Sequence, residues 1–203
     1  MKSPQILFIT GTDTGVGKTV FAALSTVYLR QNGFRVAALK PLCSGGREDA
    51  RTLHAAAGKV LSLDEVNPWY FRLPLAPVLA ARKEKKCVKL REVVAHIRHI
   101  AKQFEVVVVE GAGGLLIPMG EEFDSRDLIK ALGAMPIIVC PNKLGAVNQV
   151  RLVLEVLPPG ARANARVVLV NPMKPDAASR TNLELLTEFV ESSRLRVIPW
   201  IKI

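Results

Sequence analysis

Glycines and hydroxyl residues near the N-terminus, in Gly11-Thr12-Asp13-Thr14-Gly15-Val16-Gly17-Lys18-Thr19, have the types and spacing to bind phosphate groups. The run follows a predicted strand and opens a predicted helix, which is the context that a phosphate-binding loop requires. Its glycines let successive N–H groups turn toward phosphate oxygens, and the helix N-terminus adds a partial positive charge. Lys18 can reach the β and γ phosphates, and the Thr19 hydroxyl can bind Mg²⁺. The usual spacing places a glycine at position 12, so this loop is a variant.

A carboxylate and a second group of glycines follow another predicted strand. The predicted strand at 105–109, with valine at 106–109, leads into Glu110-Gly111-Ala112-Gly113-Gly114. An acidic residue at the carboxyl end of a buried parallel strand is well placed to hold a magnesium ion. Glycines allow a backbone to approach a ligand closely. The alternative is a glutamate in a surface turn.

Lys40 and Asp49 are two further candidates for charge chemistry. Lys40 follows the predicted strand at 35–39, so in a parallel sheet it would emerge at the same edge as the phosphate loop. A lysine there could stabilise charge on a γ phosphate, and the alternative is a lysine exposed to solvent. Asp49 is either a second carboxylate near the metal or a favourable charge at a helix N-terminus.

Short apolar runs alternate with helical patterns along the whole chain. Strands are predicted at 5–10, 35–39, 105–109, 136–140 and 166–170, and helices near 18–32, 48–58, 89–103, 146–157 and 178–192. Several strands are rich in Val and Ile without polar alternation, which indicates burial on both faces. The alternation predicts an α/β fold of the P-loop NTPase type, with a mostly parallel sheet flanked by helices. We expect one domain over residues 1–203.

Two local features also give structural expectations. The stretch 67–78 contains three prolines, which favours an ordered loop over a regular element. In the first helix, Val20, Leu24, Val27 and Tyr28 form an apolar stripe, which predicts the buried face.

The composition excludes several classes of protein. With 203 residues, 49% hydrophobic and 23% charged, the chain is an ordinary globular protein and not a mainly disordered one. No apolar run approaches the roughly 18 residues of a membrane span, and the first apolar run is too short for a signal peptide. We therefore expect a cytoplasmic protein with no membrane partner.

The charged and reactive side chains outside the motifs have simpler interpretations. The net charge of +10 is interpreted as a solvated surface, with no nucleic-acid partner, because no aromatic residues interleave with the basic cluster. The cysteines are too far apart for a zinc site and odd in number, so burial as small apolar residues is expected for Cys43, Cys87 and Cys140. We interpret the histidines as surface or packing residues: His54, His96 and His99.

Two other nucleotide-binding classes are disfavoured by single residues. Asn142-Lys143-Leu144-Gly145 resembles the guanine-reading motif of GTPases, but Gly145 replaces the aspartate that pairs with guanine. Partitioning ATPases carry a signature lysine early in the phosphate loop, where this chain has Asp13. A DNA- or membrane-binding ATPase of that type stays as an alternative.

In order along the chain, these residues resemble the dethiobiotin synthetase family. The resemblance covers almost the whole chain and adds Ser44-Gly45 after Lys40-Pro41, Lys143-Leu144-Gly145 with Asn148, Asn171-Pro172 and Ile198-Pro199-Trp200. Each piece is weak alone, but the ordered set is specific. It implies an ATP-dependent ligase that makes dethiobiotin in biotin biosynthesis. The substrates implied are 7,8-diaminononanoate and CO₂ (or bicarbonate), with the reaction passing through a carbamate and a carbamic–phosphoric anhydride.

The resemblance also implies a role for each matching residue. Lys18 and Lys40 are catalytic and neutralise phosphate and carbamate charge, while the Mg²⁺ ligands are Thr19, Asp49 and Glu110. Thr14 and Ser44 bind the substrate, whose distal carboxylate is held by Gly145 and Asn148 of the neighbouring subunit in a homodimer. ATP contacts are implied for Gly15, Val16, Gly17, Lys18, Thr19, Val20, Asp49, Glu110, Gly111, Ala112, Gly113, Asn171, Pro172, Pro199, Trp200 and Ile201.

Two questions stay open at this point. Family members continue with a further segment beyond the position of Ile203, which leaves the preference for ATP over CTP or another nucleotide undecided. A related ATP-dependent amide synthase of the cobyrinate type is a second alternative, although such chains carry an additional amidotransferase domain.

Overall fold

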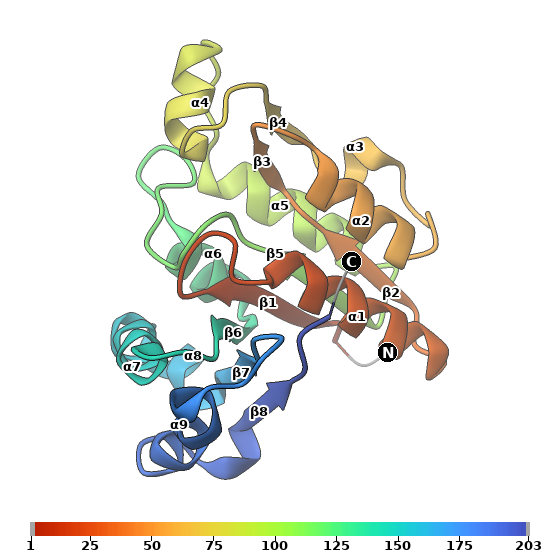
Figure 1. Ribbon diagram of the computed structural model, residues 1–203. Coiled ribbons are helices and arrows are strands. Elements are labelled where there is room, and N and C mark those ends of the chain that lie inside the picture. Colours follow the sequence, from red (N-terminus) through yellow and green to blue (C-terminus); the bar gives the residue numbers. More distant parts are fainter. Residues whose placement is uncertain (1–2, 202–203) are drawn as a thin grey trace.

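The Val- and Ile-rich strands form one six-stranded sheet in the order β2-β5-β1-β6-β7-β8 (Figure 1). The structure is a computed structural model that describes residues 3–201. All neighbouring strands of the sheet are parallel. Their bounds are β1 Gln5–Gly11, β2 Val36–Leu39, β5 Val106–Glu110, β6 Met135–Pro141, β7 Arg166–Val170 and β8 Leu195–Ile198. A separate two-stranded parallel sheet pairs β3 (Leu42–Ser44) with β4 (Trp69–Phe71).

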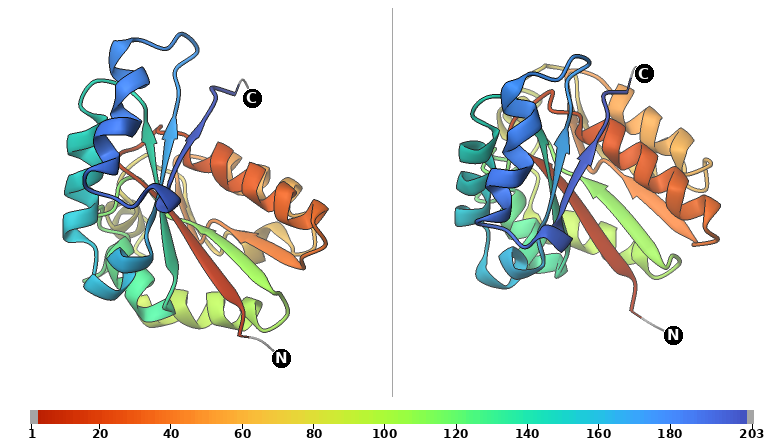
Figure 2. Two further views of the ribbon diagram at one scale, coloured as in Figure 1. Left: turned by 90° about the horizontal axis from the view of Figure 1, so that it is seen from below. Right: turned by 60° about the horizontal axis from the view of Figure 1, so that its bottom comes forward.

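Helices cover both faces of the large sheet, as the view from below shows (Figure 2). Helices α1 and α2 lie on one face, and α5, α7 and α9 lie on the other. This is the layer arrangement expected of a parallel sheet, because each crossover helix must lie on a face of the sheet. The bounds are α1 Lys18–Gln31, α2 Glu48–Ala56, α3 Leu63–Val66, α4 Pro77–Lys83, α5 Leu90–Ala101, α6 Ser125–Leu132, α7 Ala146–Val156, α8 Pro159–Asn164 and α9 Ala177–Thr187.

Each face of the sheet has its own hydrophobic core. Along β1, Phe8 belongs to the larger core, while Leu7 and Ile9 belong to the smaller one. Successive side chains of a strand point to opposite faces, so a strand without polar alternation supplies both cores at once. The α/β architecture and the parallel sheet predicted from the sequence are therefore confirmed.

The predicted elements are all present, with ends shifted by a few residues, but several short ones were missed. The stretch 67–78, expected to be a loop, contains β4 and the first residues of α4. The helix predicted near 178–192 ends earlier, at Thr187, and a short 3₁₀ turn follows at Ser192–Arg194. The missed elements, β3, β4, β8, α3, α4, α6 and α8, are too short for their hydrophobic periodicity to stand out.

The buried face expected for the first helix is wrong. In α1 the fully buried apolar position is Ala22, with Thr26 one turn further on, whereas Leu24 and Tyr28 are exposed. The Thr26 hydroxyl donates to the Ala22 carbonyl oxygen at 2.7 Å, so its polar group is satisfied within the helix. Small residues let a helix lie close to a sheet, which a pattern based on large apolar residues does not predict.

The remaining expectations concern cysteines, histidines and membrane spans. Cys43 and Cys140 are buried as predicted, but Cys87 is exposed, so that part of the prediction is wrong. His54 and His96 bond backbone carbonyl oxygens, those of Leu61 and Glu65, which agrees with packing roles. Among the helices within residues 3–201, none has the length and apolar character needed to cross a bilayer.

Candidate active site

The phosphate-loop motif occupies the turn between the end of β1 and the start of α1. Gly15 and Gly17 have φ values of 72° and 95°, a region that side chains disfavour, and Gly17 directly precedes the helix. The ammonium of Lys18 donates to the Asp13 carbonyl oxygen at 2.8 Å, so it lies across the loop. A Cβ atom on Gly11 would lie 2.6 Å from Cγ2 of Val16. This variant loop therefore needs its first glycine at position 11 rather than 12.

Replacing Gly11 with alanine is expected to weaken ATP binding about tenfold. The added methyl group must displace the Val16 side chain and also lies 3.1 Å from the Asp13 carbonyl oxygen, inside the loop that would surround the phosphates. Calorimetric titration with ATP would measure the change. Gly160→Ala is the matched control, since nothing lies within 4 Å of the Cβ built there. Equal affinity in the two variants would show that the tight contact at Gly11 is unimportant.

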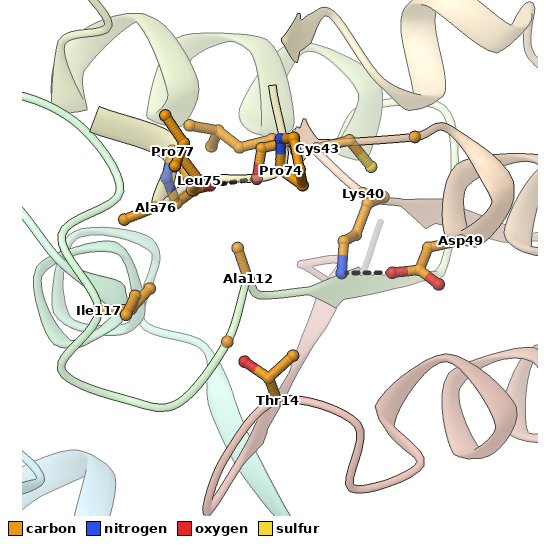
Figure 3. A pocket seen from close by; sticks show the side chains of 14 residues that line it. Thr14, Lys40, Cys43, Asp49, Pro74, Leu75, Ala76, Pro77, Ala112 and Ile117 are labelled. Atoms are coloured by element: carbon orange, nitrogen blue, oxygen red, sulfur yellow. Dashed lines mark hydrogen bonds and ion pairs between the residues drawn. The ribbon is translucent and has the colours of Figure 1, made fainter. Parts of the chain in front are cut away.

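Four side chains from separate elements meet beside this loop. Lys40, just after β2, donates to Oε1 of Glu110, the last residue of β5, at 2.6 Å. The Thr19 hydroxyl of α1 donates to the same oxygen at 2.9 Å. The Asp49 carboxylate at the start of α2 lies 3.2 Å from the Lys40 ammonium (Figure 3). Lys40 is therefore not the solvent-exposed lysine that spacing alone allowed, and Glu110 is not in a surface turn.

Burial gives this cluster its electrostatic character. Lys40 and Glu110 are 4% and 1% exposed, so each needs the opposite charge of the other. Burial opposes the charge of Lys40, but the carboxylates of Glu110 and Asp49 outweigh it and raise the pKa of Lys40. Burial and repulsion by Lys40 lower the pKa of Lys18 to about 8. An incoming polyphosphate would supply the negative charge that Lys18 lacks here.

The same cluster fits a magnesium ion. Oε2 of Glu110 is buried and has no hydrogen-bond partner among residues 3–201, so an oxygen is free to bind a cation. Thr19 and Asp49 add a hydroxyl and a second carboxylate. Within the described part of the chain, His, Cys, Asp and Glu side chains do not form a group of three or more that could hold a metal. The candidate ligands here are instead two carboxylates and one hydroxyl. Such a set suits Mg²⁺, because this ion keeps several waters and binds substrate phosphates.

A cavity of about 400 Å³ lies beside this cluster, and Lys40 is one of its lining residues (Figure 3). Its polar lining includes the predicted residues Thr14, Ser44 and Asp49. The Ser44 hydroxyl donates to the Leu75 carbonyl oxygen at 2.6 Å, which ties β3 to the segment before α4. The remaining lining is mainly apolar and includes Leu42, Cys43, Pro74, Leu75, Ala76, Pro77, Ala112 and Ile117.

Sequence reasoning missed several residues of this cavity. The segment 74–77 carries no polar signal, and only its three-dimensional position next to β3 brings it to the site. Cys43 was expected to be a simple buried residue, yet it lines the cavity. Burial raises the pKa of the Cys43 thiol to about 11, so the thiol stays protonated and is a poor nucleophile.

A second cavity of about 290 Å³ lies on the other side of the phosphate loop, beside β7 and β8. It brings together most of the expected nucleotide contacts: Gly15, Val16, Gly17, Val20, Asn171, Pro172, Pro199, Trp200 and Ile201. Pro141, Asn142, Lys143, Val170 and Ile198 also line it and were not expected. Its size and mainly apolar wall suit a flat heterocyclic base.

A few predicted residues lie elsewhere. Ala112 and Gly113 line the first cavity, not the second, and the Gly111 carbonyl oxygen accepts a hydrogen bond from Lys40 at 3.0 Å. Gly145 and Asn148 line neither cavity; they lie at the start of α7.

The chain is similar to known proteins over most of its length. Residues 5–203 match a protein family described as an AAA domain. Three relatives carry the name ATP-dependent dethiobiotin synthetase BioD. The one from Anaeromyxobacter dehalogenans (strain 2CP-C) is 38% identical over 200 residues, 96% of this chain and 89% of its own. The one from Bacillus subtilis (strain 168) is 34% identical and covers 95% and 86%. The one from Methanocaldococcus jannaschii is 37% identical and covers 82% and 79%.

The chain belongs to the dethiobiotin synthetase family. It is therefore an enzyme of a family of ATP-dependent ligases of biotin biosynthesis, and the resemblance found from the sequence is confirmed.

Solved structures show how widely the fold of this dethiobiotin synthetase family member is shared. A protein described as a plasmid partition protein of Borrelia burgdorferi B31, bound to AMPPNP, has a TM-score of 0.59 at 12% identity and covers 99% of this chain and 89% of its own. The signal recognition particle receptor FtsY from Elizabethkingia anophelis, in complex with GDP, has a TM-score of 0.58 at 13% identity, covering 97% and 57%. At such identities the likeness concerns the fold alone, which is that of the P-loop NTPases.

Proposed function

We propose that residues 1–203 act as one domain that closes the ureido ring of dethiobiotin from 7,8-diaminononanoate and CO₂, converting ATP to ADP and phosphate. The observation that carries this proposal is the position of the Lys40 ammonium. It lines the apolar cavity, while Glu110 links it to Thr19 of the phosphate loop. A substrate in the cavity would therefore meet the terminal phosphate of ATP at Lys40.

The proposed reaction has three steps. One amine of the substrate adds to CO₂ and loses a proton, giving a carbamate. A carbamate oxygen attacks the γ phosphorus, the bond to the bridging oxygen breaks, and ADP leaves with a carbamic–phosphoric anhydride formed. The second amine attacks the carbonyl carbon, loses a proton, and expels phosphate as the ring closes.

The side chains around the two cavities would favour these steps by position and charge. Lys18 and Lys40 would neutralise charge on the γ phosphate and the carbamate, an effect that is strong in a site from which water is excluded. Thr14 and Ser44, whose side chains carry hydroxyl groups, would bind the carbamate or amine end of the substrate. The apolar wall near Leu42 and Ile117 suits the hydrocarbon chain between the amines and the distal carboxylate.

Thr19, Asp49 and Glu110 would hold Mg²⁺. When bound, this ion would neutralise phosphate oxygens and orient the polyphosphate. Lys40 now donates to Glu110 and lies next to Asp49, so the carboxylates are already held in place by a cation. ATP would place its base in the second cavity, with Asn171 beside the base and Trp200 at its border. We propose ATP as the nucleotide and a cytoplasmic location, without a nucleic-acid or membrane partner.

We also propose a homodimer in which Gly145 and Asn148 of the partner subunit hold the distal carboxylate. Gly145 precedes α7 with a φ of 89°, and the first N–H groups of a helix have no partner within it, so they can bind an anion. Leu116, the residue before Ile117 of the first cavity, and Leu144, before α7, are strongly exposed. Sedimentation equilibrium is expected to give the mass of a dimer, and a monomer at micromolar concentration would contradict this arrangement.

The direct test of the proposed reaction is phosphate release from MgATP with 7,8-diaminononanoate and bicarbonate, omitting each component in turn. Release that needs all components, with dethiobiotin among the products, supports the ligase. Repeating it with CTP and GTP measures the nucleotide preference. Release without the diamine would instead favour a partitioning-type ATPase, for which salt-dependent DNA binding is the next measurement. Release that needs a different acid and an amine donor would favour a cobyrinate-type amide synthase.

A further inference from the structure

Three asparagines from three different elements form a chain of hydrogen bonds that ends at the second cavity. Asn142 follows β6, Asn171 follows β7, and Asn182 lies in α9. Asn182 donates to Oδ1 of Asn142 at 2.9 Å, and Asn142 donates to Oδ1 of Asn171 at 2.7 Å. Asn142 and Asn182 are 1% and 7% exposed. Asn142 belongs to the motif resembling the guanine-reading one, and it has no role in the proposed reaction so far.

Two backbone carbonyl groups fix which way the amides point. The Nδ2 atom of Asn142 also donates to the Ser179 carbonyl oxygen at 2.7 Å, and that of Asn182 donates to the Lys143 carbonyl oxygen at 2.9 Å. A carbonyl oxygen can only accept, so each amide must turn its nitrogen toward it. Asn142 therefore has no low-energy alternative in which its oxygen faces Asn171.

The consequence for Asn171 is a fixed polarity. Its oxygen must face the donor on Asn142, so its Nδ2 group is turned away from Asn142. Among the side-chain hydrogen bonds within residues 3–201, this Nδ2 group donates to no protein atom. Asn171 lines the second cavity with Pro172 and Ile198, and its backbone N–H is already bonded to the Ile198 carbonyl oxygen. The Asn171 side chain can thus offer N–H donors to a ligand there.

We infer that Asn142, supported by Asn182, is a positioning residue that holds the Asn171 amide as a hydrogen-bond donor toward the nucleotide base. The part of the base read at this point is then an unprotonated ring nitrogen or another acceptor. This inference rests on the proposed use of the second cavity for the base. It adds that selectivity depends on two buried asparagines, one of which, Asn182, does not line the cavity.

A double-mutant cycle on ATP affinity tests this inference, with titrations made without diamine so that ATP is not consumed. Asn171→Ala is expected to weaken ATP binding about tenfold, because one hydrogen bond in a desolvated site is lost. Asn142→Ala is expected to weaken it about fivefold, because the Asn171 amide is then free to turn. The double variant should bind ATP like Asn171→Ala alone, since Asn142 acts only through Asn171.

Inorganic tripolyphosphate is the second ligand, because it uses the phosphate loop but has no base. Its affinity should be unchanged in all variants. Asn142→Asp reverses the polarity: a carboxylate can only accept, so Asn171 would turn its nitrogen away from the base, and ATP should bind more weakly than to Asn142→Ala. The matched control is Asn164→Ala, at an exposed asparagine of α8 whose side chain, among the described residues, donates only to the Gly160 carbonyl oxygen.

Other outcomes would overturn the inference in distinct ways. Unchanged ATP affinity in Asn142→Ala would remove its positioning role. Effects that multiply in the double variant would mean that Asn142 contacts the base itself. A parallel loss of tripolyphosphate affinity would indicate a purely structural role. Unchanged ATP affinity in Asn171→Ala would instead reject the proposed base site, and the phosphate-release assay tests the ligase reaction independently of both.

Discussion

Replacing Lys40 with alanine is expected to lower kcat by about 10²–10³-fold, the usual effect of losing one preorganised charge contact to a transition state. The ammonium of Lys40 lies between the apolar cavity and Glu110, where charge would develop during transfer of the γ phosphate to the carbamate. The KM for ATP should change much less, because Lys18 and the backbone of the phosphate loop remain. Steady-state phosphate release with saturating diamine and bicarbonate measures both quantities.

The structure adds a stability effect that must be separated from catalysis. Removing Lys40 leaves the Glu110 carboxylate buried without its cation, and breaking a buried pair costs about 3–5 kcal/mol. The variant should therefore melt at a lower temperature, and Lys40→Ala combined with Glu110→Gln should recover part of that loss without recovering turnover. The control is Lys130→Ala, at an exposed lysine of α6. Turnover of Lys40→Ala within a few-fold of that control, at a temperature where both are folded, would remove Lys40 from the chemistry.

Replacing Lys18 with alanine is expected to lower kcat/KM for ATP by a similar factor, about 10²–10³-fold, but with little loss of stability. Within residues 3–201 its ammonium donates only to a backbone oxygen, that of Asp13, and burial and repulsion by Lys40 already disfavour its charge and lower its pKa to about 8. Removing a group whose charge is disfavoured in the free enzyme should leave the melting temperature unchanged or slightly raised. The effect of the substitution should therefore appear only in properties that require bound polyphosphate, such as kcat/KM for ATP.

The comparison of Lys18→Ala with Lys40→Ala therefore separates the two lysines. Tripolyphosphate should lose affinity for Lys18→Ala and keep it for Lys40→Ala, because only Lys18 belongs to the phosphate loop. Equal tripolyphosphate affinity in Lys18→Ala and Lys130→Ala would contradict the role proposed for Lys18. Thermal melts of the same samples would show whether the predicted difference in stability is present.

The sequence by itself determined the parts of this protein that depend on local patterns. The glycine-rich loop between a strand and a helix needs particular residues at particular positions, and in the structure Gly15 and Gly17 have positive φ values while Lys18 begins α1. The doubly buried strands also leave a local signal, since both faces must be apolar. In a parallel sheet the carboxyl ends of strands share an edge, so Lys40 and Glu110 could be expected near the loop.

Only the tertiary structure decided what depends on contacts between distant segments. The buried face of α1 follows from how closely Ala22 and Thr26 let it approach the sheet, and hydrophobic periodicity carries no such information. The cavity wall at 74–77 and the position of Cys43 depend on the small sheet of β3 and β4, whose strands are too short to predict. The orientation of Asn171 depends on Asn142, which follows β6 and is 29 positions away, and through it on Asn182 in α9, which is 40 positions from Asn142. Such hydrogen bonds have no sequence period, because they link elements that only the folded sheet brings together.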